Sequence, residues 1–471
     1  MSPLAADSGL TTRLQGIVGR EGVISRPSEL LVYESDGLTS YRRTPGGVVF
    51  PRSTEEVSGV LQVLFEAGVP VVPRGAGTGL SGGALADGDA VVVSTTRMAE
   101  ILELDPPNRR AVVQPGVINA ELSAACLPFG LMYAPDPSSQ SACTLGGNVA
   151  ENSGGPHCLK YGVTSRYVTG LEVVLAHGEV VSLGGRGRGG AGLDLVGLFV
   201  GSEGCLGIAT AIEVALSPIP PAVRTLLAIF DRIEDAGRAV TEIIGDGLLP
   251  AALEIMDGPT IRAVEASVFA AGYPTDAAAA LVVEFDGLDS GLDRDAARAE
   301  AHCRNAGARD VQKAALEEAR AGLWKGRKKA FGAMGRIAPD LMVQDATVPR
   351  STLPSVLAKI SEIGSRYDLH VANVFHAGDG NLHPNILFDH RDEAELARVE
   401  AASREIMAVC VEAGGTITGE HGVGVDKRKY MGLVFNPDTL RAFVGVARAF
   451  DPRGRMNPGK VLPDETWAEV P

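Results

Sequence analysis

The pattern of apolar and polar positions separates two regions with different secondary structure. Residues 1–45 have the pattern of a helical lead-in. From about residue 48 to 218, short β-rich runs alternate with helices, and the expected strands are 69–72, 90–94, 111–114, 170–176 and 207–216. The run Ser217-Pro218-Ile219-Pro220-Pro221 predicts a linker, since three prolines in four residues cannot continue a helix or a central strand.

Beyond this linker the pattern predicts strands covered by helices. The expected strands are 225–230, 251–255 and 281–285, and the expected helices are 233–245, 293–306, 313–334, 352–367, 393–413 and 438–450. The sequence therefore predicts an α+β fold with antiparallel strands. We expect a lead-in over 1–45, a first domain over 46–221, a second over 222–415 and a C-terminal segment over 416–471.

Composition narrows the class of protein. A length of 471 residues fits two or three domains, and the net charge of −15 argues against a nucleic-acid partner. No window approaches 18 uninterrupted apolar residues, and the first residues lack the pattern of a signal peptide. The six cysteines have no paired spacing, which is typical of buried thiols in a reducing compartment. We expect a cytoplasmic protein.

Glycine-rich loops are concentrated in the first domain. Residues 74–83 follow an expected strand and contain the pattern G-x-G-x-x-G. A Rossmann site requires a helix directly after these glycines, and the sequence predicts none there. Backbone N–H groups can still hold a dinucleotide phosphate, although a tight turn without a ligand is the alternative. Similar loops at 135–155, 161–164 and 201–208 favour close backbone approach to a flat, extended cofactor.

Two histidines flank an Asp-Gly pair in the second domain. If Asp379-Gly380 forms a two-residue type I′ turn, His376 lies opposite His383, with Cβ atoms roughly 5 Å apart. Asn385 then lies on the same face. Glu420, in a second glycine-rich loop, could complete a His2Glu set that leaves coordination positions open, as in catalytic zinc sites. Such a set also suits manganese or iron, and the alternative is ordinary polar histidines.

These motifs together resemble the vanillyl-alcohol-oxidase-type flavoproteins. The resemblance extends over about residues 48–462 and is greatest for the D-2-hydroxy-acid branch, which includes glycolate oxidases and D-lactate dehydrogenases. It implies FAD bound by a bilobal α+β domain over 46–221, a cap domain over 222–415 and a C-terminal helical segment that returns to the flavin. The residues expected at FAD are Arg74, Gly75, Ala76, Gly77, Thr78, Gly79, Leu80, Ser81, Pro135, Asp136, Ser139, Gly146, Gly147, Asn148, Ser153, Gly154, Tyr161, Gly162, Glu203, Gly207, Ile208 and Asn457.

The resemblance also assigns roles for the chemistry. Arg327 matches the arginine that binds the substrate carboxylate, although its basic stretch could instead be a solvated helix face. A metal at His376, His383 and Glu420 would lower the pKa of the substrate hydroxyl, and His421 would take the proton. Asn385 would help to hold the substrate. Some relatives carry the flavin covalently on a histidine; we expect non-covalent FAD, with His157 a polar neighbour of the ring.

Two departures indicate a small substrate. Dicarboxylate-oxidising relatives carry a lysine on the strand over 341–345, where this chain has Val343, and Phe331 replaces a substrate-binding threonine. We expect oxidation of glycolate or D-lactate. The alternatives are a D-2-hydroxyglutarate-type dehydrogenase, a non-catalytic FAD-binding subunit of a larger complex and a transferase of the same fold.

The expected electron acceptor lies outside the chain. Because no iron–sulfur cysteine cluster is present, electrons would pass to another protein, a quinone or an iron–sulfur partner subunit. Such partners could also make the protein peripheral to a membrane.

Overall fold

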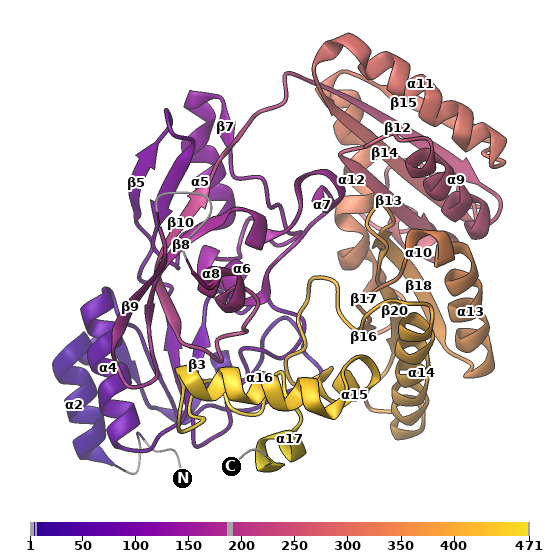
Figure 1. Ribbon diagram of the computed structural model, residues 1–471. Helices are drawn as coiled ribbons and strands as arrows, with labels where there is room; N and C mark the ends of the chain where they lie inside the picture. The colour runs from indigo at the N-terminus through magenta and orange to yellow at the C-terminus, as the bar shows by residue number, and fades with distance from the viewer. Residues whose placement is uncertain (1–3, 5–6, 186–191, 470–471) are drawn as a thin grey trace. The chain divides into compact units, whose positions relative to one another are not determined.

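The chain divides into two compact units. The computed structural model describes residues 4, 7–185 and 192–469 (Figure 1). The first unit comprises Met1–Ser153, Val163–Ile219 and Glu420–Pro471, and the second comprises Gly154–Gly162 and Pro220–Gly419. The chain thus changes unit inside the proline-rich segment, where we expected a linker. Residues 154–162, which the sequence analysis assigned to the first domain, belong instead to the second unit.

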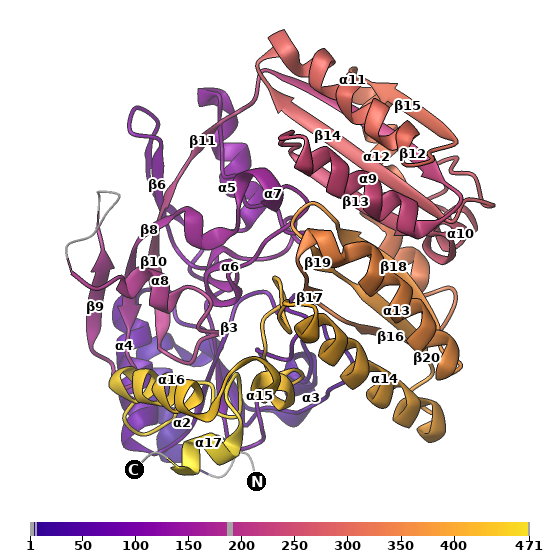
Figure 2. The same ribbon diagram turned by 45° about the vertical axis from the view of Figure 1, so that its right-hand side comes forward.

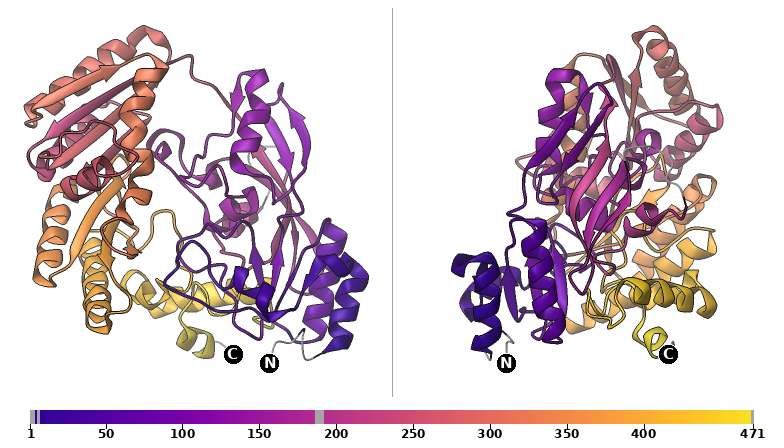
Figure 3. Two further views of the ribbon diagram at one scale, coloured as in Figure 1. Left: turned by 180° about the vertical axis from the view of Figure 1, so that it is seen from behind. Right: turned by 60° about the vertical axis from the view of Figure 1, so that its left-hand side comes forward.

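A small mixed sheet opens the first unit. Its order is β1 (Val23–Ile24), β2 (Gly47–Val49), β4 (Val91–Ser94) and β3 (Val71–Arg74), with β4 parallel to both β2 and β3. Helices α2 (Ser8–Val18) and α4 (Thr54–Glu66) lie beside this sheet (Figure 3). Their side chains Leu14, Val60 and Leu61 are buried in the core. The expected helical lead-in is therefore helical only in part, because β1 lies within it.

An antiparallel sheet forms the rest of this unit. Its order is β5 (Ile101–Asp105), β6 (Arg110–Val113), β10 (Ile208–Ala215), β8 (Val168–Val174) and β9 (Val180–Gly184). Short helices α5 (Asn119–Cys126), α6 (Leu145–Glu151) and α8 (Leu195–Phe199) lie in its connections. The pair β7 (Leu131–Met132) and β11 (Ser217–Pro218) stands apart, so the expected linker begins with a strand. Proline is tolerated there because a two-residue edge strand needs few donors.

The C-terminal segment returns to the first unit through helices. It contains α15 (Met431–Val434), α16 (Pro437–Phe450) and α17 (Asp464–Glu469). Between the last two, Met456 forms a parallel bridge with Val71 of β3. This bridge brings the residues after Met456 to the strand that precedes the first glycine loop.

Nine strands among the described residues form the sheet of the second unit. These are β12 (Ala222–Phe230), β13 (Ala252–Asp257), β14 (Ala279–Gly287), β15 (Asp310–Ala314), β16 (Asp340–Val343), β17 (Ala346–Thr347), β18 (His370–His376), β19 (Asn381–Leu382) and β20 (Pro384–Phe388). Their pairings are antiparallel, as expected. The central pairs are β12–β14, β14–β13 and β13–β18.

Helices cover both faces of this sheet (Figure 2). One face packs on α10 (Gly258–Glu265) and α12 (Glu317–Met334), which enclose Trp324, Ala330 and Met334. The other face carries α9 (Ile233–Gly245), α11 (Asp289–Asn305) and α13 (Leu353–Arg366), with α14 (Glu393–Glu412) beside α13. The helix expected over 313–334 begins later, because Lys313 belongs to strand β15.

Candidate active site

The Asp-Gly hairpin has a different register from the one we expected. His376 pairs with Asn381 and not with His383, and the turn spans the four residues 377–380. Gly380 has φ +80°, but Asp379 is not among the positive-φ residues, so a type I′ turn is excluded. Instead, the Asp379 carboxylate accepts the N–H of Asn381 at 3.1 Å, which closes a longer turn. The two-residue turn was therefore a wrong prediction.

The two histidines are nevertheless neighbours. Their ring centroids lie 5.3 Å apart, nearly perpendicular, and both side chains are buried. His383 lies two positions beyond Asn381, the partner of His376. Because side chains alternate along a strand, His383 is therefore on the same face as His376, as its diagonal neighbour. Asn385 is also buried, and its Nδ2 donates to the carbonyls of Ala372 and His383. Its Oδ1 has no hydrogen-bond partner among the described residues.

A buried carboxylate that the sequence analysis missed lies beside His376. Glu254, on β13, pairs in register with His376 on β18. Its carboxylate oxygens lie 2.8 and 2.9 Å from Nδ1 of His376. Arg327 of α12 donates to the same carboxylate through Nε at 2.7 Å, and its Nη2 lies 3.4 Å from Nδ1 of His376. Arg327 is thus a buried side chain next to His376 and not part of a solvated helix face.

A second missed carboxylate holds the loop that leads to Glu420. Asp345 is fully buried and follows β16. It accepts the Thr418 hydroxyl at 2.6 Å and the Gly419 N–H at 3.1 Å. One of its oxygens lies 3.8 Å from Nδ1 of His383. Asp345 therefore fixes the residue that precedes Glu420 in the second unit, close to one of the histidines.

Glu420 and His421 begin the final segment of the first unit. Their side chains are largely buried, with 14% and 12% exposed, and lie 3.8 Å apart. The residues that follow are fixed by groups from the loops that we expect to bind a cofactor. Glu203 accepts the N–H groups of Val423 and Gly424 at 2.6 and 2.7 Å, and the Ser81 carbonyl accepts the N–H of Val425 at 3.0 Å.

The first glycine loop continues directly from strand β3. Arg74 ends the strand, and its guanidinium donates to the carbonyl of Ser35 and to that of Ala84, the residue that follows the loop. The rest of the expected set, Gly75, Ala76, Gly77, Thr78, Gly79, Leu80 and Ser81, follows without regular secondary structure. Gly77 has φ +71°, and a Cβ at Gly75 would meet the Thr144 hydroxyl at 2.3 Å. Glycine is thus required at both places.

Two other expected cofactor segments converge near this loop. Gly146, Gly147 and Asn148 form the first turn of α6, which Thr144 caps by accepting the Gly147 N–H. Asn457 donates through Nδ2 to the carbonyls of Gly83 and Glu203 at 2.9 and 2.6 Å. The C-terminal segment thus returns to the end of the glycine loop that follows β3.

Polar atoms in these segments fit a ligand with hydrogen-bonding edges. The Ser81 hydroxyl, the Asn457 Oδ1 and the Asn148 side-chain amide are buried and have no hydrogen-bond partner among the described residues. Buried polar groups are normally paired, because an unpaired one costs about 1–3 kcal/mol. A cofactor with polar edges is therefore a suitable partner for this unit.

The other expected cofactor residues occupy varied positions. Pro135, Asp136 and Ser139 lie in the segment after β7, where the Pro135 carbonyl accepts the Asn119 side chain. Ser153 accepts the Thr164 hydroxyl and N–H through its carbonyl. Gly207 has φ +146° and precedes Ile208, the first residue of β10. Because the Ile208 side chain is buried in the apolar core, only its backbone is suited to contact a cofactor.

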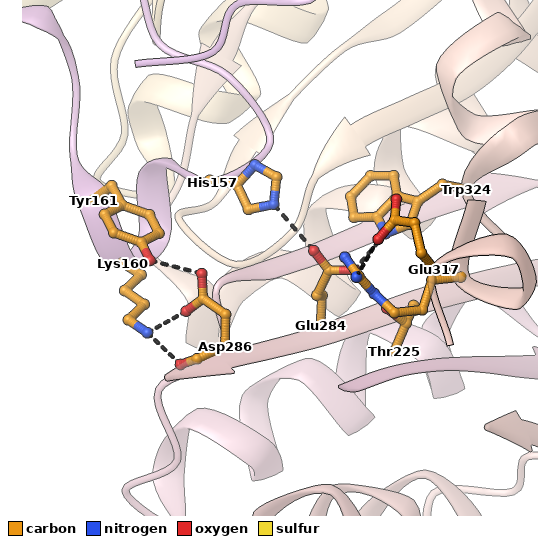
Figure 4. Close-up of polar contacts among 9 residues, drawn as sticks. His157, Lys160, Tyr161, Thr225, Glu284, Asp286, Glu317 and Trp324 are labelled. Carbon is orange, nitrogen blue, oxygen red and sulfur yellow. Dashed lines mark hydrogen bonds and ion pairs between the residues drawn. The ribbon is translucent and has the colours of Figure 1, made fainter. Parts of the chain in front are cut away.

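Residues 154–162 carry three further expected residues, Gly154, Tyr161 and Gly162. In the second unit, α7 (Cys158–Tyr161) lies against β14 (Figure 4). Lys160 and the Tyr161 hydroxyl both contact the Asp286 carboxylate. Nε2 of His157 lies 3.3 Å from Glu284, which also accepts the Trp324 indole N–H at 2.8 Å. The polar ends of Tyr161 and His157 are therefore engaged by acidic side chains of β14.

Sequence patterns could not single out Glu254, Asp345 and Glu284. Glu254 and Glu284 lie within largely apolar strands and Asp345 follows one, and the partners of each come from distant segments. The available signal was the rule that a charge in a buried strand is paired. That rule predicts a partner but not which one.

Comparison with known proteins identifies both parts of the chain. Residues 45–184 match the family model "FAD binding domain", and residues 219–461 match "FAD linked oxidases, C-terminal domain". The chain is 50% identical to "Glycolate oxidase subunit GlcD" of Escherichia coli K12 over 441 residues, which covers 94% of this chain and 88% of that protein. It is 35% identical to "D-lactate dehydrogenase" of Anaerostipes hadrus, covering 91% and 92%.

Solved structures support the same fold. The chain superposes on 4-ethylphenol oxidase from Gulosibacter chungangensis with a TM-score of 0.80 and 21% identity, covering 97% of this chain and 98% of that one. For p-cresol methylhydroxylase the TM-score is 0.76 with 18% identity, covering 96% of both chains. Within the described residues, helices with the length and apolarity to cross a membrane are absent.

Proposed function

This chain belongs to the FAD-linked oxidases, and we propose that it oxidises a small 2-hydroxy acid, glycolate or D-lactate, to the 2-oxo acid. The observation that carries the proposal is the buried carboxylate of Glu254, which contacts both His376 and Arg327, with the ring of His383 next to that of His376. Two imidazoles beside a guanidinium suit an anionic substrate that must also lose a proton. The names of two relatives, glycolate oxidase subunit and D-lactate dehydrogenase, support this substrate class.

FAD is the proposed cofactor of the first unit. Bound FAD would accept the hydride that the substrate loses from Cα. The glycine loop 74–81, the first turn of α6 and Asn457 would hold it. The unpaired buried atoms of Ser81, Asn148 and Asn457 support this assignment. Non-covalent binding is proposed, since Nε2 of His157 lies beside Glu284.

A divalent metal is proposed at His376, His383 and Glu420. These residues offer two imidazole nitrogens and a carboxylate oxygen, a set that could hold a metal ion. Zinc, manganese and iron all accept such ligands. A divalent ion there would lower the pKa of the substrate hydroxyl. In support, the two rings are adjacent, and Glu420 is joined to Gly419, which Asp345 holds.

The remaining roles follow from the chemistry of the side chains. Arg327 would orient the substrate carboxylate, since a guanidinium donates in a planar fork. His421 would accept the hydroxyl proton, because an imidazole titrates near neutral pH. The Oδ1 of Asn385, buried and unpaired among the described residues, could accept a hydrogen bond from the substrate hydroxyl.

Val343 supports a monocarboxylate substrate. Val343 on β16 pairs with Asn385 on β20, so its side chain lies next to a residue that we propose holds the substrate. A valine offers no charge to a distal carboxylate, and an unpaired buried carboxylate is strongly disfavoured. A D-2-hydroxyglutarate-type activity is therefore the less favoured alternative.

A partner subunit is the proposed electron acceptor. The relative of 50% identity is called a subunit of glycolate oxidase. The six cysteines of this chain are widely spaced along the sequence and four are buried, so they lack the spacing of an iron–sulfur cluster motif. Electrons would pass to an iron–sulfur subunit, another protein or a quinone.

The test combines spectra, metal content and dye reduction. The purified protein should be yellow and release its FAD in acid, and glycolate or D-lactate should bleach it without oxygen. His376→Ala, His383→Ala and Glu420→Ala should each lower the bound metal and the rate of dye reduction while the flavin spectrum stays unchanged. A colourless protein that cannot be reconstituted with FAD excludes the cofactor assignment. Full activity of metal-free His383→Ala excludes the metal assignment alone.

A further inference from the structure

Glu254 combines complete burial with two functional neighbours. Its side chain is 0% exposed, and its ion pair with Nη2 of Arg327 has an N–O distance of 2.6 Å. The same carboxylate lies 2.8 and 2.9 Å from Nδ1 of His376. It therefore contacts both the proposed carboxylate-binding residue and one proposed metal ligand.

A second buried carboxylate on the same sheet face provides a comparison. Ala252 of β13 pairs with Glu284 of β14, so Glu284 lies on the face that carries Glu254. Glu284 accepts hydrogen bonds from Thr225 and Trp324 and lies near Arg320; among the described residues it contacts neither His376 nor Arg327. Arg320, Trp324 and Arg327 share one side of α12. Both acids thus fasten the same helix to the same sheet, but only Glu254 reaches His376.

The contact with Glu254 determines which nitrogen of His376 can bind a metal. A carboxylate beside a guanidinium accepts hydrogen bonds and does not donate them. At 2.8 Å, Nδ1 of His376 must therefore carry the proton. The lone pair is then on Nε2, so Nε2 is the nitrogen through which His376 could bind a metal ion. A carboxylate behind a histidine is a common support for metal ligands, because it fixes the ring and raises its basicity.

The same carboxylate fixes Arg327 before any substrate arrives. Nε and Nη2 both point to Glu254, so the plane of the guanidinium is set by the sheet. The remaining N–H groups keep a defined direction toward a ligand. Because the side chain is already ordered, little rotamer entropy is lost on binding.

We propose that Glu254 is a positioning residue that presents Nε2 of His376 to the metal and the guanidinium of Arg327 to the substrate carboxylate. This inference rests on the proposed function. It extends that function by joining metal affinity and substrate affinity through one side chain. Glu254 itself touches neither the metal nor the substrate.

The test compares Glu254→Gln with Glu284→Gln in the FAD-loaded protein. Both changes keep side-chain volume and remove one buried charge under α12. Glu254→Gln should weaken metal binding, measured by chelator competition, by about 10–100-fold and raise the KM for glycolate, with FAD content unchanged. Glu284→Gln should keep the metal affinity of the unchanged protein. Equal metal affinity and equal KM in folded Glu254→Gln overturn the inference.

A measurement on the unchanged sequence avoids dependence on variant folding. Nitrogen-15 labelling of histidine reports the tautomer of His376 in metal-free protein, with His376→Ala to assign its signals. A protonated Nδ1 is expected, and a protonated Nε2 overturns the inference. Failure of the metal proposal has a different readout, because His383→Ala would then keep both its bound metal and its activity.

Discussion

The carboxylate of Glu203 accepts the backbone N–H of Val423 at 2.6 Å, two residues after His421. The neighbouring N–H of Gly424 binds the other oxygen at 2.7 Å. Glu203 is buried, and its carbonyl accepts the Asn457 side chain. The acid that we expected to line the flavin therefore holds the loop that carries the proposed base. Burial raises the pKa of Glu203, while these two N–H groups oppose the shift.

Gly424→Ala should disturb this loop selectively. Gly424 has φ +51°, and an added Cβ would lie 2.0 Å from the Ser81 carbonyl oxygen. The loop must shift, and misplacement of His421 should lower flavin reduction by glycolate at least about 10-fold. The measurement is anaerobic stopped-flow reduction. Gly432→Ala is the matched control, because nothing lies within 4 Å of its added Cβ. Equal rates in both variants contradict the role of the loop.

His421→Ala should separate the proton acceptor from the metal ligands. Metal and FAD should remain bound, while kcat falls about 100-fold or more for a lost general base. The KM should change little, because the base acts mainly in the transition state. The measurements are metal analysis and steady-state dye reduction. Loss of metal from His421→Ala, as from His383→Ala, would mean that Glu420 and His421 have been assigned the wrong way round.

The sequence predicted what depends on local pattern. The helix over 233–245 and the long strands β8, β10, β12 and β14 were found, because apolar period and glycine position are local signals. The hairpin register was not predicted correctly. A type I′ turn at Asp379-Gly380 competes with a longer turn closed by the Asp379 side chain, and the sequence alone does not show which of the two is more stable. Strand β15 was missed since its residues are mostly exposed at a sheet edge.

Only those site residues that belong to recognisable sequence motifs could be predicted. The prediction that His376 and His383 are neighbours held despite the wrong register, because a diagonal pair on one face is still within reach of large ring side chains. Glu254 could not be found, since it meets His376 and Arg327 only after three distant segments pack together. Tertiary packing, which the pattern does not encode, decided that contact.

Acid stability should depend on Glu284. Burial alone would raise the pKa of this carboxyl, but hydrogen bonds from His157, Thr225 and Trp324 lower it to about 2. A carboxyl with a depressed pKa stabilises the fold above its unfolded pKa of about 4.5, and this contribution is lost as the pH falls toward 2. At about 1.4 kcal/mol per pKa unit, the pH-dependent part amounts to about 3 kcal/mol.

Glu284→Gln isolates this contribution. The free energy of unfolding of Glu284→Gln should lack the decline that protonation of Glu284 causes in the unchanged protein. The difference in unfolding free energy between the unchanged protein and this variant should therefore narrow as the pH falls from 5 to 2. Urea unfolding at several pH values measures this. Asp257→Asn is a useful comparison. Burial raises the pKa of Asp257, so the difference in unfolding free energy between the unchanged protein and Asp257→Asn should not narrow as the pH falls. A constant difference for Glu284→Gln across the range contradicts the prediction.

Substrate choice should respond to a cation at Val343. This side chain is buried on β16 opposite Asn385, and it offers nothing to a second carboxylate. The unchanged protein should therefore prefer glycolate or D-lactate to D-2-hydroxyglutarate by at least about 30-fold in kcat/KM, or about 2 kcal/mol. Val343→Lys should raise kcat/KM for D-2-hydroxyglutarate about 10-fold or more and lower it for glycolate. Leu341→Lys is the matched control, on the same side of the same strand but opposite Leu387. Equal gains in both lysine variants would show a general charge effect, and preference of the unchanged protein for the dicarboxylate would overturn the substrate assignment.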